Sequence, residues 1–224
     1  MIELKYQPIL SSFASRPEHI LCGTPEGESS KYWSGSMISG AGDYVKEGMV
    51  AIDYGCGNAR CGNYLSGCLK DFLYVGLEPD TPHGNQCLAY DRETYKDPRF
   101  VFGHCDSSLE AEMLGKASVV YLGSVFTHTL IEDTYRILDK FLPLINRGGT
   151  VVFSYIAATI YAFIGPNTYD IEKGFGIVYN LPSQYFEYAK NNGLRYEQYG
   201  VCTKLSGPAH QIARFVKEKI NVNL

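Results

Sequence analysis

The sequence predicts an α/β protein, with a single domain built on a mostly parallel seven-stranded sheet, helices on both faces and an antiparallel hairpin at the C-terminus. Short apolar runs alternate with helix-like segments between residues 49 and 155, which is typical of parallel strands linked by helices. A glycine turn separates the first two apolar runs. Two alternating segments near the C-terminus flank Ser206-Gly207-Pro208, a sequence typical of a hairpin turn.

The first strand is expected at 49–54, a short apolar run bounded by Gly48 and Gly55, which suits a buried parallel strand better than a helix. The same criteria predict further strands at 72–77, 100–103, 117–122 and 149–155. Between them the periodicity predicts helices at 58–69, about 83–94, about 108–114 and 129–142. A last helix is expected to begin at Leu181-Pro182-Ser183 and to end at Asn192-Gly193, before hairpin strands at 194–203 and 209–217.

The turn after the first strand is suited to a nucleotide ligand. Gly55 and Gly57 have no Cβ, so a ligand can lie against the backbone where the next helix begins. Glu78 ends the second strand 25 positions after Asp53, close to the spacing of about 20 residues at which an acid bonds ribose hydroxyls in dinucleotide-binding folds. A dinucleotide fingerprint needs a third glycine where this chain has Arg60, which argues against NAD or FAD.

The pattern acid-x-Gly-x-Gly-x-Ala, from Asp53 to Ala59, resembles the first motif of the Rossmann-like, class I S-adenosylmethionine (SAM) dependent methyltransferases, where glycine is commoner than Ala59. Residues 100–107 resemble the third motif of that family, and 117–128 resemble its fourth strand with the Ser-Val-Phe-Thr-His turn. Residues 147–153 are similar to its Gly-Gly turn into strand five. The resemblance therefore consists of four motifs in the family's order.

The resemblance implies SAM as the cofactor, with S-adenosylhomocysteine (SAH) as the product. By position Glu78 would bind the ribose, Asp106 would accept a hydrogen bond from the adenine amino group, and Asp53 would orient the amino-acid end of SAM, directly or through water. The residues expected to bind the cofactor are Tyr32, Trp33, Asp53, Gly55, Cys56, Gly57, Glu78, Pro79, Asp106, Ser107, Gly123 and Ser124.

Two regions are candidates for substrate recognition. Residues 1–48 would form an N-terminal segment that covers cofactor and substrate, ahead of a methyltransferase domain at 49–224. Tyr32 or Trp33 could face the sulfonium of SAM, or they could simply anchor a helix. An aromatic, glycine-containing insertion at about 156–180 could close as a lid, pack on itself or form a dimer contact. A homodimer is therefore one expectation.

His128 and His210 are the candidate catalytic bases, because an unperturbed imidazole titrates near neutrality. His128 follows the fourth strand, and His210 belongs to the terminal hairpin, which borders the acceptor site in the resembling family. The alternative is that His128 bonds a backbone carbonyl and only shapes the pocket. Methyl transfer needs the acceptor held in line with the methyl group, so proximity contributes much of the rate.

The composition suits a cytoplasmic protein. The net charge is −4, the seven cysteines are scattered without a CxxC pair, and no apolar run approaches the length of a transmembrane helix. We therefore expect no metal site, no disulfide framework and no membrane span. A nucleic-acid partner is disfavoured because basic residues concentrate only near the C-terminus.

The sequence favours methyl transfer to an oxygen or nitrogen atom of a small molecule. A methyltransferase acting on protein or nucleic acid and a non-catalytic SAM-binding subunit are the alternatives. The segment from Leu122 to Val125 lacks the Asn/Asp-Pro-Pro-Tyr motif of many adenine and glutamine N-methyltransferases, which disfavours that branch. Because Asp53 and Glu78 are both present, a catalytically dead homologue is less favoured than an enzyme. Arg60 and the terminal hairpin disfavour an oxidoreductase.

Overall fold

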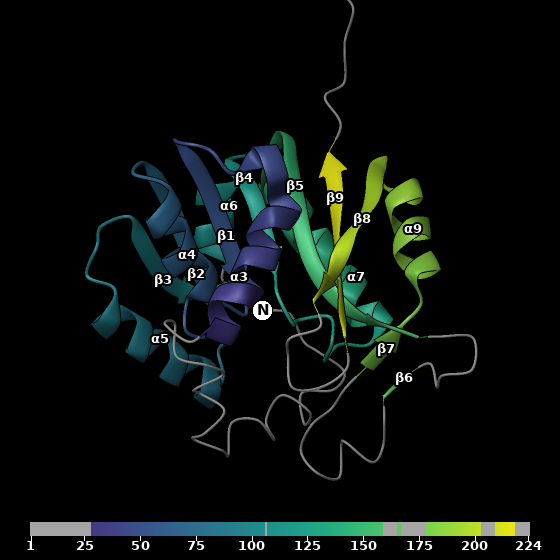
Figure 1. Cartoon of the computed structure of the whole chain (residues 1–224), viewed down its shortest axis with the longest axis horizontal. Coiled ribbons are helices and arrows are strands. Elements are labelled where there is room, and N and C mark those ends of the chain that lie inside the picture. Colours follow the sequence, from purple (N-terminus) through teal and green to yellow (C-terminus); the bar gives the residue numbers. More distant parts are fainter. Residues whose placement is uncertain (1–27, 106, 159–164, 167–177, 203–208, 218–224) are drawn as a thin grey trace, which may run out of the picture.

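The computed structural model describes residues 28–105, 107–158, 165–166, 178–202 and 209–217. Its described part is a twisted sheet covered on both faces by helices (Figure 1). The long strands run in the order β3-β2-β1-β4-β5-β9-β8, in which the first five are parallel and β9 is antiparallel to both neighbours. Their bounds are β1 Met49–Tyr54, β2 Phe72–Glu78, β3 Phe100–His104, β4 Ala117–Leu122, β5 Ile145–Ala157, β8 Leu194–Cys202 and β9 His210–Lys217.

Two helical layers pack on the sheet. On one face, α3 and α4 contribute Trp33, Met37 and Leu65 to a buried cluster with the strands. On the other face, α7 and α9 contribute Ile137 and Tyr185 to a second cluster. The helices are α3 Glu28–Ala41, α4 Arg60–Cys68, α5 Pro82–Thr94, α6 Ser107–Met113, α7 Ile131–Phe141 and α9 Pro182–Asn191, with 3-10 turns η1 Gly42–Tyr44 and η2 Leu142–Leu144.

The predicted fold class is confirmed, and the predicted strands all form within two residues of their expected ends, except that β5 begins at Ile145 instead of 149. Helix α7 begins at Ile131, two residues after the expected start. Two short strands were not predicted, β6 Gly165–Pro166 and β7 Val178–Asn180, and both belong to the aromatic insertion. Only 156–158, 165–166 and 178–180 of that insertion are described, so the lid prediction lies largely outside the described residues.

The parallel strands all end at the same edge of the sheet, the lower edge in Figure 1. The turn after β1 is joined to the end of β2, because Gly55 N–H donates to Leu77 O at 2.8 Å. Among the described residues we find no helix that combines the length and the apolar character needed to cross a membrane.

The segment between β2 and α5 is fixed closely to the sheet. Thr81 caps α5, since its hydroxyl accepts a hydrogen bond from Gly84 N–H at 3.0 Å, and Pro82 occupies the first turn, where its missing N–H costs nothing. A Cβ on Gly84 would collide with the backbone carbonyl oxygen of Pro79 and would lie 3.1 Å from Glu78 Cβ. Glycine at position 84 therefore allows α5 to pack directly against the end of β2.

We expect Gly84→Ala to destabilise the protein by about 1–3 kcal/mol, because a backbone atom cannot move aside as the tip of a side chain can. The matched control is Gly67→Ala in α4, where a Cβ meets no atom within 4 Å. That change should instead stabilise the helix by about 0.5–1 kcal/mol. Chemical denaturation measures both free energies of unfolding, and equal effects of the two substitutions would contradict the packing described here.

Candidate cofactor site

The glycine turn after β1 has the backbone conformation that its sequence predicts. Gly55 and Gly57 have φ angles of 71° and 58°, which side-chain-bearing residues rarely adopt. A Cβ on Gly57 would meet no atom within 4 Å, so the backbone there faces open space. The turn thus presents a bare backbone to any ligand at this edge of the sheet.

Ala59 also adopts a left-handed conformation, with φ 50° and ψ 36°, at the N-cap of α4. This conformation costs an L-residue about 1–2 kcal/mol. We expect Ala59→Gly to leave the free energy of unfolding unchanged or to raise it by up to about 1 kcal/mol, since relieved strain offsets the greater flexibility of the unfolded chain. The control is Ala89→Gly on the exposed face of α5, which should cost about 1 kcal/mol. A similar loss at both positions in denaturation experiments would rule out the strained turn.

Glu78 lies directly across from this turn. Its Oε1 accepts a hydrogen bond from Gly57 N–H at 2.7 Å, and only 6% of the residue is exposed. Burial raises the pKa of the Glu78 carboxyl to about 7, the Gly57 hydrogen bond opposes this rise, and the Asp53 charge adds to it. The structure therefore brings together the glycine turn and the acid that the sequence predicts to bind ribose.

Asp53 is buried at the other side of the turn, where its Oδ2 accepts a hydrogen bond from Tyr74 Oη at 2.7 Å. Burial raises the pKa of the Asp53 carboxyl to about 6, against the lowering effect of the Tyr74 bond. Tyr74 belongs to the neighbouring strand β2, so this bond could not be predicted from the local motif. Contact between Asp53 and a cofactor stays a prediction.

Asp91 is a third buried carboxyl, which the sequence analysis missed. Asp91 is 0% exposed, and Cys56 Sγ lies 3.8 Å from its Oδ2. The other carboxyl oxygen, Oδ1, has no hydrogen-bond partner within the described part of the chain. Burial, followed by the charge of Glu78, raises the pKa of the Asp91 carboxyl to about 8. Helical periodicity in the sequence could have indicated that Asp91 is buried. The buried positions of α5 recur at helical spacing: Gly84, Cys87, Leu88 and Asp91.

At the end of β4, α3 covers the turn that contains Gly123 and Ser124. A Cβ on Gly123 would lie 3.4 Å from Trp33 Cζ2, and Trp33 is itself 2% exposed. Ser124 has a φ of 61°, and its N–H donates to Ser154 Oγ at 2.8 Å. The predicted positions at Trp33, Gly123 and Ser124 therefore form one wall at the same edge of the sheet as Glu78.

The two candidate catalytic histidines lie near one another at this wall. The His210 ring packs edge-on against Trp33, with 5.2 Å between ring centroids, and its buried Nδ1 has no partner among the described residues. Burial and the neighbouring His128 lower the pKa of the His210 imidazole to about 4. His128 precedes α7 and is half-buried. His210 is therefore neutral at pH 7, which suits hydrogen bonding better than proton storage.

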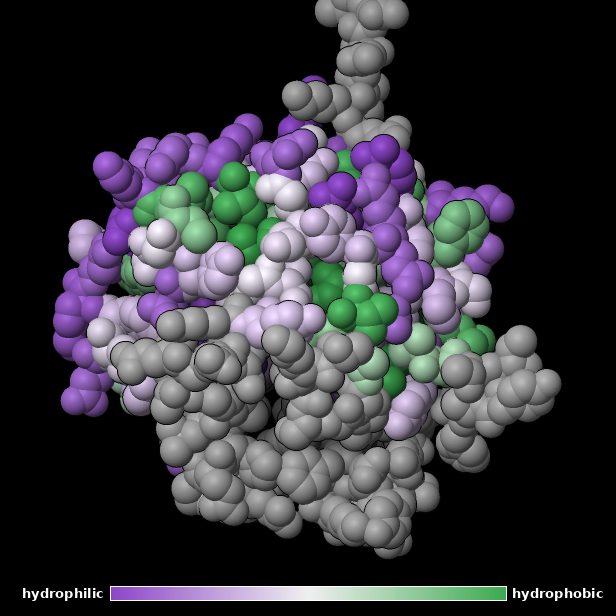
Figure 2. Space-filling model, viewed as in Figure 1, coloured by the Kyte–Doolittle hydropathy of each residue, from purple (hydrophilic) through white to green (hydrophobic). Residues whose placement is uncertain are grey.

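Tyr32, the other predicted aromatic contact, lies in a different place. It lines an open groove across the outer surface of α3, together with Ser36, Tyr64, Tyr199 and Val201. Figure 2 shows this face, where hydrophobic side chains are exposed among hydrophilic ones; Val201 is 46% exposed.

The other predicted cofactor residues are only partly described. Asp106 lies outside the described residues, and Ser107 is described only as the first residue of α6. Cys56 is buried beside Asp91, and Pro79 follows Glu78 and accepts a hydrogen bond from Thr81 N–H through its carbonyl oxygen. The predicted adenine end of the site therefore rests on sequence position alone.

Comparison with known proteins identifies the fold. No protein-family model and no curated protein matches the sequence. Many solved structures that share its fold are class I SAM-dependent methyltransferases. Magnesium protoporphyrin IX methyltransferase from Synechocystis PCC 6803, with bound SAH, is 14% identical, with a TM-score of 0.65 over 93% of this chain and 97% of that one.

Two further structures are similar to the same degree. The 1,6-didemethyltoxoflavin-N1-methyltransferase from Burkholderia thailandensis, with its substrate and SAH bound, is 12% identical, with a TM-score of 0.66 over 96% of this chain and 89% of that one. A structure described as the complex between the Haloferax volcanii Trm112 methyltransferase activator and the putative methyltransferase is 14% identical, with a TM-score of 0.66 over 96% of this chain and 100% of that one. This chain therefore has the fold of SAM-dependent methyltransferases.

Proposed function

We propose that the protein is a SAM-dependent methyltransferase that transfers a methyl group to an oxygen or nitrogen atom of a small molecule. The observation that carries the proposal is the hydrogen bond from Gly57 N–H to Glu78 Oε1 at the edge of the sheet, beside the open space that a Cβ on Gly57 would enter. A buried carboxylate beside a bare glycine backbone fits a ribose and its neighbouring polar groups, because the acid can accept from two hydroxyls while the glycines allow close approach. The residues present therefore fit SAM.

When bound, SAM supplies an electrophilic methyl group. In this proposal Glu78 holds the ribose, the Gly55–Gly57 turn lies against the amino-acid end, and Asp106 binds adenine. Trp33 closes the wall over Gly123, which keeps water away from the reacting edge. Each of these groups positions the cofactor, and positioning is the main requirement of methyl transfer.

The acceptor would lie beside His128 and His210, near the Trp33 wall. His210, held neutral by burial, would orient an acceptor hydroxyl or N–H through its unpartnered Nδ1. His128 would then be the better candidate base. A small acceptor is supported by the net charge of −4, which gives no general attraction to nucleic acid. The Burkholderia enzyme, which has the same fold, is bound to 1,6-didemethyltoxoflavin, and this supports a small acceptor.

Methyl-labelled SAM tests the proposal directly. The purified protein is incubated with labelled SAM and panels of phenols, carboxylic acids, amines and nitrogen heterocycles, beside samples of mixed protein and RNA. SAH formation with label in one small-molecule product is the expected result. Label found only in protein or RNA would overturn the small-molecule acceptor, and SAH binding without transfer to any panel would favour a non-catalytic subunit.

A further inference from the structure

Asp53 lies between two buried tyrosines from the strands on either side of β1. Tyr74 of β2 and Tyr121 of β4 are both 0% exposed, and Tyr121 is the direct partner of Asp53 in the β1–β4 register. Tyr74 Oη donates to Asp53 Oδ2 at 2.7 Å, whereas Tyr121 Oη has no hydrogen-bond partner among the described residues. Of these two tyrosines, Tyr74 is therefore the one that orients the carboxylate.

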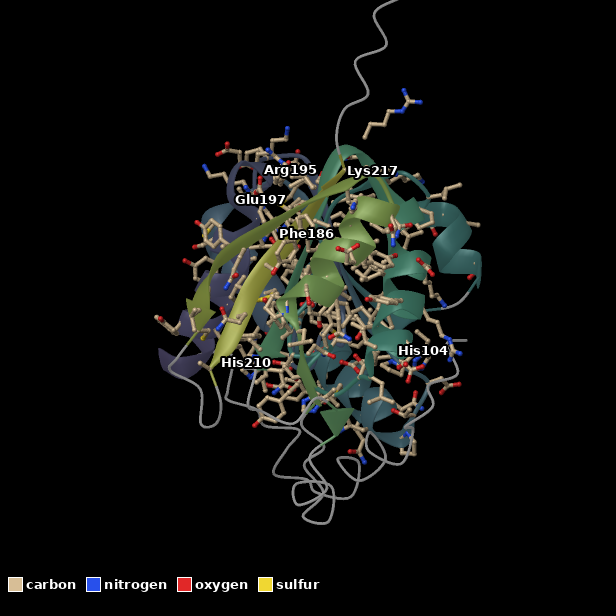
Figure 3. All side chains as sticks on the ribbon, turned by 90° about the vertical axis from the view of Figure 1, so that its right-hand side faces the viewer. His104, Phe186, Arg195, Glu197, His210 and Lys217 are labelled. Atoms are coloured by element: carbon tan, nitrogen blue, oxygen red, sulfur yellow. The ribbon has the colours of Figure 1, made fainter. Side chains whose placement is uncertain are left out.

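The proposed cofactor would cross the ends of the strands in their order in the sheet, β3-β2-β1-β4. In that proposal adenine lies after β3, which ends at His104, and the ribose lies at Glu78, the end of β2. The proposed acceptor lies beside His210, where β9 begins, and Figure 3 shows His104 and His210 well apart. The end of β1, between these two places, is left for the amino-acid end of the cofactor.

Asp53 and Glu78 point to the same face of the sheet. Side chains alternate along a strand, so those of Tyr74 and Glu78 lie on one face of β2. The register pairs Asp53 with Gly76, two residues before Glu78, and this places the Asp53 side chain on that face as well. A ribose and an α-ammonium group both donate hydrogen bonds, and two carboxylates on one face provide an acceptor for each.

Tyr74 is built to hold the Asp53 carboxylate in one direction. Its ring packs against Phe100 of β3, with 5.4 Å between ring centroids, so the hydroxyl projects from a fixed position. Both the hydrogen bond from Tyr74 and the charge of Arg60 favour the ionised form of Asp53, by lowering its pKa against the effect of burial. The Cys61 thiol also bonds to Asp53, but a thiol is a weak donor. Without the Tyr74 hydroxyl, the buried acid would lose its strongest neutral donor.

We propose that Tyr74 is a positioning residue for the amino-acid end of SAM: its hydroxyl fixes the Asp53 carboxylate, which binds the α-ammonium group of the cofactor. This inference rests on the proposed function. It adds the contact by which the site distinguishes a nucleoside that carries an α-amino acid from the same nucleoside without one. Tyr74 is fully buried, so it acts through Asp53 rather than by touching the cofactor.

Calorimetric titration with two ligands tests the proposal. SAH carries the α-amino acid, whereas 5′-methylthioadenosine shares its adenine, ribose and sulfur but lacks the amino acid. We expect Tyr74→Phe to bind SAH about tenfold more weakly and to bind 5′-methylthioadenosine within about twofold of wild type. Tyr121→Phe removes an unpartnered hydroxyl on the other side of Asp53, so this matched control should bind both ligands as wild type does.

Equal losses for the two ligands in Tyr74→Phe would overturn the proposal, because a tyrosine that only supports the fold would loosen the ribose site along with the rest of the edge. Unchanged SAH affinity would overturn it too. Denaturation shows whether each variant is folded. Asp53→Asn, which leaves Tyr74 in place, is a second variant with the same expectation: a loss for SAH, none for 5′-methylthioadenosine, and equal losses as the contrary result.

A double-substitution cycle with SAH alone tests whether Tyr74 acts through Asp53. In the Asp53→Asn protein, the further change Tyr74→Phe should alter SAH affinity by less than about twofold, because the charged acceptor is already gone. Full and independent losses from the two substitutions would overturn the proposal. If wild-type protein binds neither SAH nor 5′-methylthioadenosine, the proposed function itself fails, which differs from binding by wild type without a selective loss in Tyr74→Phe.

Discussion

Glu78→Ala should weaken SAH binding by about 100-fold, the largest effect on cofactor affinity that the site predicts. A buried carboxylate that accepts from ribose hydroxyls forms charge-assisted hydrogen bonds, each of which contributes about 1.5–3 kcal/mol. The substitution also leaves Gly57 N–H without the partner that it has at 2.7 Å. Calorimetric titration of wild type and variant with SAH measures the change.

Two variants control this experiment. Glu78→Gln keeps the size of the side chain and an oxygen for Gly57 N–H but removes the charge, so its affinity should lie between wild type and Glu78→Ala. Glu93→Ala changes an exposed acid on α5 and should leave binding unchanged. Folding of each variant is checked by denaturation. If a folded Glu78→Ala protein binds SAH within twofold of wild type, the cofactor does not use the β2 acid.

Asp91→Asn should stabilise the protein at pH 8 by about 4 kcal/mol, the largest stability effect that we expect. The Asp91 carboxyl has its pKa raised from an ordinary 3.8 to about 8, chiefly by burial. Between these values the folded chain holds a proton that the unfolded chain has released, so the free energy of unfolding falls as pH rises. Asparagine keeps the shape of the side chain and cannot ionise.

The gain should therefore depend on pH. Below about pH 4 the carboxyl is protonated in both the folded and the unfolded chain, and Asp91→Asn should be close to neutral; the gain should then grow by about 1 kcal/mol per pH unit toward pH 8. Denaturation of both proteins at several pH values gives the curves, with Glu93→Gln on the exposed face of α5 as the control. Parallel curves for wild type and Asp91→Asn would mean that Asp91 does not change its proton affinity on folding.

The sequence predicted the sheet well because its strands are short apolar runs bounded by turn residues. The β1 run from Met49 to Tyr54 lies between Gly48 and Gly55, and the structure places it as expected. Strands β6 and β7, with two and three residues, are too short to give a periodic signal. The early start of β5 at Ile145 accompanies a register shift in its pairing with β4, between Ala117 and Val119, which alternation alone does not reveal.

The candidate site could be predicted only in part. The positions of Gly57 and Glu78 follow from their motif, because the ends of adjacent parallel strands meet at one edge. Asp91 could have been found from helical periodicity, since it lies on the buried face of α5. The bond from Tyr74 to Asp53 could not, because it joins separate elements through side chains whose directions the sequence does not give.

The central claim is that the edge of the sheet around Glu78 and Gly57 binds SAM. Calorimetric titration of the purified wild-type protein with SAM and, in parallel, with NAD tests this claim most directly. We expect saturable binding of SAM at one site and no binding of NAD. Binding of NAD without binding of SAM would contradict the assignment and would indicate a dinucleotide enzyme built on the same edge of the sheet.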